Sequence, residues 1–187
     1  MEKIVNYYEK KLKKYGATFK GVDWNSYESQ NLRFKKLTKS LIEKKNRYSL
    51  LDYGCGYGAL LKYINDNYDN IDYFGYDFSK SMIKQAKIIN DNLKKTSWLS
   101  ELKEADTFDY IIASGIFNVK LNYHHTGWLK QVIETLDKIN SISKKGFSFN
   151  LLTTFSQKEK RRNKLFYGDP SYLFKHCKEN YSKHVSL

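Results

Sequence analysis

Residues 50–61, LLDYGCGYGALL, place an acid and three glycines between two apolar runs. The glycines Gly54, Gly56 and Gly58 allow a tight backbone turn and let the backbone approach a ligand with no Cβ in the way. If a strand precedes this loop and a helix follows it, the helix N-terminus presents unpaired N–H groups to the same ligand. The segment therefore predicts a cofactor-binding loop.

Two classes of cofactor use such a loop. The spacing G-x-G-x-x-A, from Gly54 to Ala59, fits a dinucleotide fingerprint, and on this spacing a nicotinamide dehydrogenase stays open. The spacing D-x-G-x-G-x-G, from Asp52 to Gly58, fits an S-adenosylmethionine loop. A carboxylate at Asp52 would oppose a pyrophosphate, whereas it would favour the α-ammonium and the sulfonium of S-adenosylmethionine. We therefore favour S-adenosylmethionine as the cofactor.

A second acid, Asp77, lies 25 positions after Asp52 in the segment YFGYDFSKSM. An acid at the end of a second strand can accept hydrogen bonds from ribose hydroxyls. The alternative for Asp77 is an acid favoured by the dipole of the following helix. Phe78 could pack on the adenine face or in the core. Cys55 lies inside the loop, and we expect its thiol to fill space there, since no histidine is near it in the sequence to activate it.

Alternating apolar runs and helical periodicities must position these acids. Strands are predicted at residues 48–52, 71–77, 97–99, 108–113, 147–152 and 183–187. Helices are predicted at residues 1–15, 30–45, 58–67 and 127–141, and from Ser79 and Pro170 onward, while residues 16–29 are expected to be irregular. Strands that alternate with helices indicate a doubly wound α/β sheet, whose ligands lie beyond the carboxyl ends of the strands. The loops that matter most are then 52–58, 77–79 and 114–125.

Three segments, LLDYGCGYG, FGYDFSKSMIKQAK and FDYIIASGIF, carry a resemblance to a known family. They resemble the class I S-adenosylmethionine-dependent methyltransferases of the small bacterial type, over about residues 48–152. The resemblance implies a Rossmann-like, mostly parallel sheet. The family sheet has seven strands and ends in an antiparallel hairpin, whereas this chain supplies six. We therefore expect that hairpin to be incomplete and residues 183–187 to be a poorly held edge.

The resemblance also implies roles for single residues. Asp52, Gly54 and Gly56 would bind the methionine end of the cofactor, and Asp77 would bind the ribose. After the third strand, Glu101 is the candidate for adenine, with a solvated loop acid as the alternative. The full set of expected cofactor contacts is Asp52, Gly54, Cys55, Gly56, Gly58, Asp77, Phe78, Glu101, Ser114 and Gly115.

The segment after the fourth predicted strand, SGIFNVKLNYHHTGW, holds the candidate catalytic residues Asn118, His124 and His125. A histidine could remove a proton from a hydroxyl or amine acceptor. The alternative is that both histidines start the following helix and face water. Many methyl transfers need no strong base, because alignment of the reacting groups supplies most of the rate.

Two further segments could contact the substrate. Residues 21–34 precede the first predicted strand, in a position that in this fold class commonly crosses the cofactor opening, although a tryptophan there could instead anchor the segment to the core. The basic loop at residues 155–168 places arginines among aromatic residues, a combination that can bind phosphates, although a solvated loop is the alternative. The candidates from the two segments are Trp24, Asn25, Arg33, Arg161 and Arg162.

Length and composition bound the remaining choices. The 187 residues predict one domain, with a helical cap segment at 1–45 and a Rossmann-like core at 46–187. The formal charge is +13, but 29 of the 33 basic residues are lysine. Because arginine suits phosphate recognition better, a lysine-coated surface is favoured over a nucleic-acid face. The two cysteines lack metal-ligand spacing, so we predict no metal, and their small number predicts a reducing, cytoplasmic setting. Because no stretch is long and apolar enough to span a membrane, we expect no membrane partner.

We interpret the chain as a methyltransferase that acts on a small-molecule acceptor. The segments SGIFN and LFYGDP are similar to those of small bacterial methyltransferases associated with sugar or polysaccharide metabolism. One alternative is an RNA methyltransferase that uses the basic loop 155–168. The other is a non-catalytic module that binds the cofactor. The oligomeric state stays open at this point.

Overall fold

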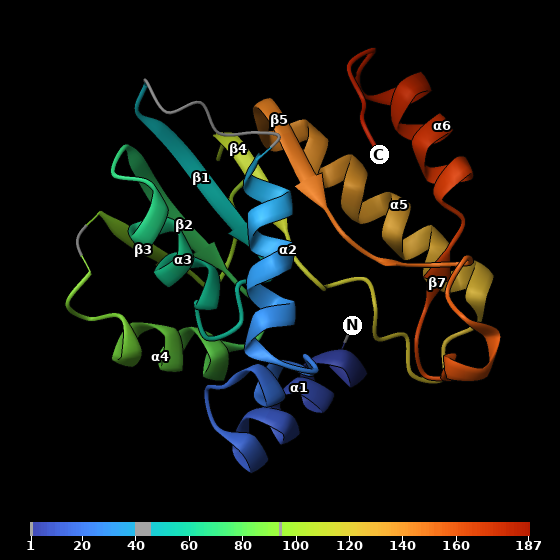
Figure 1. Cartoon of the computed structure of the whole chain (residues 1–187). Coiled ribbons are helices and arrows are strands. Elements are labelled where there is room, and N and C mark those ends of the chain that lie inside the picture. Colours follow the sequence, from blue (N-terminus) through green and yellow to red (C-terminus); the bar gives the residue numbers. More distant parts are fainter. Residues whose placement is uncertain (1, 40–45, 94) are drawn as a thin grey trace. The chain divides into compact units, whose positions relative to one another are not determined.

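A sheet of five parallel strands, in the order β3-β2-β1-β4-β5, forms the centre of one of two compact units (Figure 1). The computed structural model describes residues 2–39, 46–93 and 95–187. The first unit comprises Met1–Ser114 and Ile142–Phe149, and the second comprises Gly115–Ser141 and Asn150–Leu187. The strands of the sheet are β1 Tyr48–Tyr53, β2 Ile71–Tyr76, β3 Thr96–Leu99, β4 Phe108–Ala113 and β5 Ser143–Phe149.

The strand order reverses at β1, which pairs with β2 on one side and with β4 on the other. Asp52, near the carboxyl end of β1, lies opposite Gly75 of β2 and Ile112 of β4. A reversal of this kind opens a crevice at the carboxyl ends of the strands, where ligands of doubly wound sheets bind. The predicted doubly wound parallel sheet is confirmed, and its reversal point coincides with the glycine loop.

Apolar side chains from the sheet and two helices make the core of the first unit. Helices α2 (Tyr27–Lys39) and α3 (Ala59–Asn67) pack on one face of the sheet. Leu50 and Ile112 of the sheet are fully buried there, and Leu61 and Ile64 of α3 have only 1% of their surface exposed. Each such side chain contributes about 1.5–3 kcal/mol through burial. This packing holds α2 and α3 against the sheet.

Two further helices begin where short polar side chains cap them. Helix α4 (Lys80–Ile89) starts after Ser79, whose hydroxyl accepts the N–H of Met82. Helix α6 (Pro170–Asn180) starts after Asp169, whose carboxylate accepts two backbone N–H groups, and Pro170 occupies its first turn. Both starts agree with the sequence prediction, because a polar cap satisfies N–H groups that the helix itself cannot.

The second unit contains α5 (His125–Ile142, with Ile142 counted in the first unit), α6 and a small sheet. The small sheet pairs β6 (Leu152–Thr153) with β7 (Tyr167–Gly168) in parallel, and a short 3-10 turn, Lys158–Lys160, lies between them. Trp128 of α5 is buried and donates its indole N–H to the carbonyl of Phe117 at 2.9 Å. Phe166 is fully buried in the same unit. Tyr181, after α6, donates to Asp137 of α5 at 2.6 Å.

Three predicted segments differ most clearly from the structure. Residues 183–187 form no strand, because this short segment is mostly exposed and pairs with no other strand that the structure describes. Strand β5 begins at Ser143 and ends at Phe149, since its pairing with β4 starts at the exposed, polar end of the strand. The segment 16–29 is not wholly irregular: it holds a 3-10 turn, Phe19–Val22, and the start of α2. The predicted end of that helix, at 40–45, lies outside the described residues.

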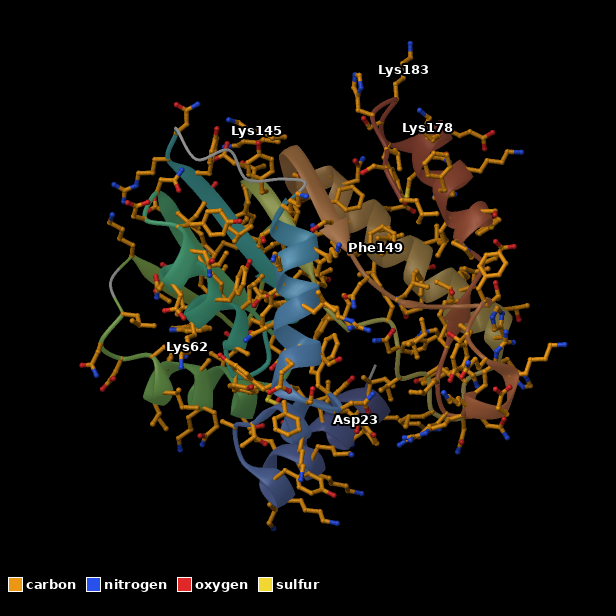
Figure 2. All side chains as sticks on the ribbon, viewed as in Figure 1. Asp23, Lys62, Lys145, Phe149, Lys178 and Lys183 are labelled. Atoms are coloured by element: carbon orange, nitrogen blue, oxygen red, sulfur yellow. The ribbon has the colours of Figure 1, made fainter. Side chains whose placement is uncertain are left out.

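The surface carries the lysines that the composition predicts. Figure 2 marks Lys62, Lys145, Lys178 and Lys183, and all four are exposed. No helix within residues 2–39, 46–93 and 95–187 combines the length and the apolar character needed to cross a membrane.

Candidate functional site

The loop after β1 has the backbone geometry that its glycines predict. Gly54, Gly56 and Gly58 all adopt positive φ, at 79°, 56° and 83°. At Gly58 a side chain is also excluded by space, because a Cβ there would lie 2.4 Å from the ring of Trp98. The N–H groups of Gly54 and Cys55 donate to the carbonyl of Tyr76 at 2.7 and 2.9 Å, which ties the loop to the end of β2.

Asp77, directly after β2, is bonded to the same loop. One carboxylate oxygen accepts the N–H of Gly56 at 2.9 Å, and the other accepts the N–H of Ser79 at 2.8 Å. Burial raises the pKa of Asp77 above its usual range, while the N–H groups of Ser79 and Gly56 oppose this rise and nearby Glu9 adds to it. Since a carboxylate oxygen has two lone pairs, both oxygens retain capacity for a further donor.

Asp52 lies at the end of β1 with only 3% of its surface exposed. The hydroxyl of Tyr73 donates to one carboxylate oxygen at 2.6 Å. Burial raises the pKa of Asp52 to about 7; the bond from Tyr73 opposes the rise and the charge of Asp77 adds to it. No lysine, arginine or histidine among the described residues forms an ion pair with this carboxylate. A buried carboxylate in this setting is suited to receive a cation from a ligand.

Ser114 directly follows β4 and lies two residues after Ile112, which pairs with Asp52. Its hydroxyl oxygen is buried and has no hydrogen-bond partner among the residues that the structure describes. Buried polar atoms in native proteins nearly always have a partner. The orphan hydroxyl therefore fits a ligand with polar groups at this edge, as S-adenosylmethionine has in its amino-acid part.

Three other expected cofactor contacts lie at or near this edge. Phe78, next to Asp77, is 49% exposed, and its ring contacts Tyr76 edge to face at 5.3 Å. Glu101 is exposed beyond the end of β3. Cys55 is buried in the loop, and burial raises the pKa of its thiol well above the usual range, which disfavours the thiolate needed for a nucleophile.

The N-terminal helix α1 (Glu2–Tyr15) contacts the start of α4, and the 3-10 turn after it approaches this loop. From the sequence, residues 21–34 are expected to cross the cofactor opening, but no contact is assigned to α1. Glu9 accepts hydrogen bonds from the hydroxyls of Ser79 and Ser81 at 2.9 and 3.0 Å. Val22 lies close enough to the loop that a Cβ on Gly56 would be 3.0 Å from it. No signal in the sequence pairs Glu9 with two serines some 70 positions away.

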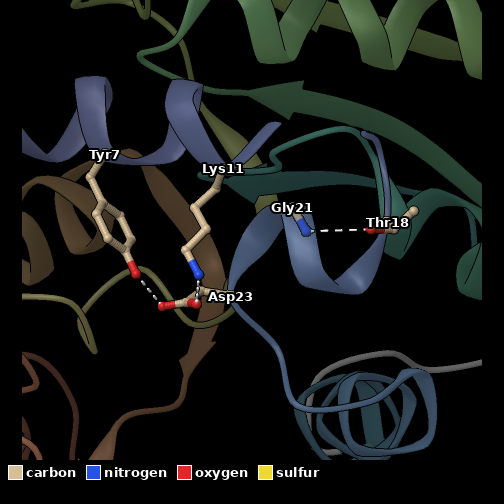
Figure 3. A network of polar contacts seen from close by, with 5 residues as sticks. All are labelled: Tyr7, Lys11, Thr18, Gly21 and Asp23. Atoms are coloured by element: carbon tan, nitrogen blue, oxygen red, sulfur yellow. Dashed lines mark hydrogen bonds and ion pairs between the residues drawn. The ribbon is translucent and has the colours of Figure 1, made fainter. Parts of the chain in front are cut away.

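Asp23 holds the turn against α1 (Figure 3). Its two carboxylate oxygens accept from the Tyr7 hydroxyl and the Lys11 ammonium, each at 2.6 Å. The N–H of Gly21 donates to the Thr18 hydroxyl in the same turn. The candidate substrate contacts follow directly: Trp24 is half-buried with the Arg33 guanidinium 5.9 Å from its ring, and Asn25 is exposed.

The candidate catalytic residues belong to the second unit. The side-chain carbonyl of Asn118 accepts the N–H of Leu152 at 3.0 Å, so this oxygen already supports the backbone. The carbonyl of His124 accepts the N–H of Trp128 at the start of α5. The ring of His125 lies 4.7 Å from that of Phe166, and its Nε2 is 3.2 Å from the carbonyl of Tyr167. Both histidines are exposed at the helix start, which agrees with the alternative that they begin the helix and face water.

The remaining candidates of the second unit are also engaged. Gly115 has φ 80° and donates its N–H to Asn150 at 2.9 Å. Arg161 donates to the carbonyls of Thr154 and Ser156, so its guanidinium closes the basic loop on itself. Arg162 is exposed. Among the described residues, no group of three or more histidines, cysteines and acids is arranged to hold a metal ion.

Comparisons with known proteins show the family of the chain. A family model described as a methyltransferase domain matches residues 24–185. The Mycobacterium tuberculosis (strain H37Rv) protein Rv1506c, itself named provisionally as a methyltransferase, is 40% identical over 147 residues, which cover 79% of this chain and 89% of that protein.

Two solved structures share the fold at low identity. Magnesium protoporphyrin IX methyltransferase from Synechocystis PCC 6803, with S-adenosylhomocysteine bound, has a TM-score of 0.61 at 12% identity and covers 80% of this chain and 71% of its own. Phosphoethanolamine N-methyltransferase 1 of Haemonchus contortus has a TM-score of 0.65 at 13% identity and covers 95% of this chain and 40% of its own. Since the family model matches most of the chain and a methyltransferase-named relative is 40% identical, the chain belongs to this methyltransferase family.

Proposed function

We propose that this methyltransferase transfers the methyl group of S-adenosylmethionine to a small-molecule acceptor, of a kind related to sugars or polysaccharides. The observation that supports the cofactor assignment most strongly is the pair of acids at the ends of two adjacent strands. Asp52 lies one residue before the end of β1, Asp77 follows β2, and the glycine loop after β1 is bonded to Asp77.

Residues in and around the glycine loop would each bind a different part of the cofactor. The spare lone pairs of Asp77 would accept the ribose hydroxyls, and the half-exposed ring of Phe78 would pack on adenine, with Glu101 next to it. Asp52 and the orphan hydroxyl of Ser114 would receive the amino-acid part. The bound cofactor supplies an electrophilic methyl group on a sulfonium.

On the acceptor side, we propose His125 as the base, with His124 as a further candidate base and Asn118 as a polar group near the transferred methyl. Because a carbonyl can only accept, Nε2 of His125 carries the proton toward Tyr167, and Nδ1 of the neutral ring keeps its lone pair. A base of this kind would remove the proton of a hydroxyl acceptor. The contacts proposed for the acceptor are Trp24, Asn25, Arg33, Arg161 and Arg162.

Three observations support the proposals on acceptor class, domain organisation and location. The two fold relatives described above carry small molecules, phosphoethanolamine and magnesium protoporphyrin IX, in their names. The family match from residue 24 to residue 185 runs through both compact units, which supports one methyltransferase domain over 1–187, with a cap segment at 1–45. Both cysteines are buried and unpaired, which fits a reducing, cytoplasmic setting.

Calorimetric titration with S-adenosylmethionine, S-adenosylhomocysteine and NAD tests the cofactor. We expect micromolar binding of the first two, no binding of NAD, and loss of binding in Asp77→Ala. Binding of NAD alone would refute the cofactor assignment. Release of S-adenosylhomocysteine is then measured with hydroxyl-bearing sugars and nucleotide sugars as acceptors. Cofactor binding with no turnover on any acceptor would favour a non-catalytic module.

An RNA acceptor is the second candidate, and one observation favours it. Phe155 is 81% exposed within the basic loop, where an aromatic ring beside cations could stack on a base. RNA binding by this loop would weaken steeply with salt and would fall in Arg162→Ala. Binding that does not respond to salt would exclude this acceptor.

A further inference from the structure

A buried hydrogen bond joins the first two strands beneath the glycine loop. Tyr73 lies opposite Leu50, one side-chain step before Asp52 on the same face of the sheet. Gly75, the residue directly opposite Asp52, has no side chain, so the Tyr73 hydroxyl reaches the carboxylate at 2.6 Å. Both side chains are buried, with 1% and 3% of their surface exposed.

The tyrosine ring is held in place by its surroundings. Trp98 of β3 contacts the Tyr73 ring edge to face at 5.7 Å. A Cβ on Gly75 would lie 2.5 Å from the ring of Trp98 and 3.1 Å from the Cys55 sulfur, so the indole occupies the space that the glycine leaves. The ring of Tyr73 therefore has little freedom, and its hydroxyl fixes one oxygen of Asp52.

The second oxygen of Asp52 is left without a hydrogen-bond partner among the described residues. The titratable groups whose charges act with that of Asp52 are Tyr73, Cys55 and Asp77, and none of them is a cation. A carboxylate buried without a cation is costly, and a ligand cation relieves that cost. Asp52 thus has one oxygen bonded to Tyr73 and one oxygen with no hydrogen-bond partner among the described residues.

We propose that Tyr73 is a positioning residue that holds Asp52 ready for the α-ammonium of the cofactor and thereby sets the pH range over which cofactor affinity changes. This inference rests on the proposed S-adenosylmethionine function. When Asp52 is protonated, its attraction for the ammonium is lost, so affinity falls as the pH is lowered. Without the Tyr73 bond, the ionised form loses a stabilising donor, so affinity at a given pH falls and its pH dependence moves to higher pH.

The test compares wild type, Tyr73→Phe and a matched control, Tyr53→Phe. Tyr53 is a buried tyrosine of β1 that follows Asp52 and lies on the opposite face of the sheet. Dissociation constants are measured by calorimetry from pH 5.5 to pH 9 for two probes. S-adenosylhomocysteine carries the α-ammonium, and methylthioadenosine carries the adenine and ribose but no amino-acid part.

We expect Tyr73→Phe to bind S-adenosylhomocysteine about tenfold more weakly at pH 7.5, as loss of a bond to a charged group implies, with its pH profile moved to higher pH. Its affinity for methylthioadenosine and all affinities of Tyr53→Phe stay at wild-type values. An equal loss for both probes, or a wild-type pH profile in Tyr73→Phe, would overturn the inference while leaving the cofactor assignment intact. A wild type that binds neither probe would overturn the proposed function itself.

Discussion

The carboxylate of Asp77 accepts the N–H of Gly56 at 2.9 Å, so the end of β2 and the glycine loop after β1 are one bonded unit. The same carboxylate accepts the N–H of Ser79 at the start of α4. One acid therefore both shapes the loop and has lone pairs left for a ligand. Substitutions at this acid should affect stability and cofactor binding together.

Asp77→Ala removes both backbone bonds. We expect a loss of about 1–3 kcal/mol in the free energy of unfolding, since two N–H groups lose their acceptor. Cofactor binding should fall below detection by calorimetry. Ser81→Ala is the control, because it removes a hydroxyl of the same helix start that bonds to Glu9 and Ser79 and not to the glycine loop as the structure describes it. If Asp77→Ala bound S-adenosylhomocysteine as wild type does, the ribose role of Asp77 would be wrong.

Asp52→Asn should stabilise the protein without cofactor at alkaline pH. The folded pKa of about 7 lies above the unfolded value of about 3.9, so the folded state holds this proton more tightly. The stability that this group contributes is fully present below about pH 4 and is lost as the pH rises through 7. Asparagine never ionises, so the variant should be more stable than wild type by about 2–4 kcal/mol at pH 8.

Urea denaturation at pH 5, 6.5 and 8 measures this difference, which should narrow steadily as the pH falls toward 4. Asp109→Asn gives the opposite sign, because the N–H of Ser49 holds the pKa of Asp109 below its usual range, so its contribution is lost as the pH falls. If the difference in the free energy of unfolding between Asp52→Asn and wild type were the same at all three pH values, the pKa of Asp52 would not be raised by folding.

Gly58→Ala should destabilise the loop. The residue has φ 83°, and a Cβ would lie 2.4 Å from the ring of Trp98. Both strain and overlap contribute, so we expect a loss of about 2–4 kcal/mol by thermal or urea denaturation. Gly127→Ala is the matched control: it lies in α5 with no atom near its Cβ position, and alanine should raise stability there by up to about 1 kcal/mol. Equal changes in stability for Gly58→Ala and Gly127→Ala would contradict the prediction that the loop requires a glycine at position 58.

The sheet and the glycine loop could be predicted because local patterns specify them. Buried strands such as β1 and β4 are apolar runs, and the segment from Asp52 to Gly58 has one strand-to-helix interpretation. Strand β5 was placed less well because its first residues, including Lys144 and Lys145, are polar and exposed. Their strand conformation comes from pairing with β4, more than 30 positions earlier in the chain, and no local pattern carries that information.

The candidate site divides in the same way. Asp77 could be assigned from its spacing, but its bond to Gly56 depends on how the loop folds back over β2. The sequence pattern assigns Tyr73 no role beyond its place in a strand, and the register of β1 and β2 places its hydroxyl on Asp52. Glu9 and Asp23 were missed because their partners lie on other elements. Contacts between elements decide these roles, whereas the sequence pattern describes single elements.

Arg161→Ala should loosen the basic loop, whereas Arg162→Ala should leave it ordered. Arg161 donates to the carbonyls of Thr154 and Ser156, and its guanidinium lies 5.5 Å from the Tyr167 ring. Arg162 instead donates its backbone N–H to the Tyr167 hydroxyl. We therefore expect at least tenfold faster amide exchange over residues 154–162 in Arg161→Ala, and wild-type exchange in Arg162→Ala. Arg161→Lys should exchange nearly as fast as Arg161→Ala, because an ammonium cannot reproduce the fork that reaches two carbonyls. Unchanged exchange in Arg161→Ala would mean that the loop is held by its backbone alone, and Arg161 would then be available to an acceptor.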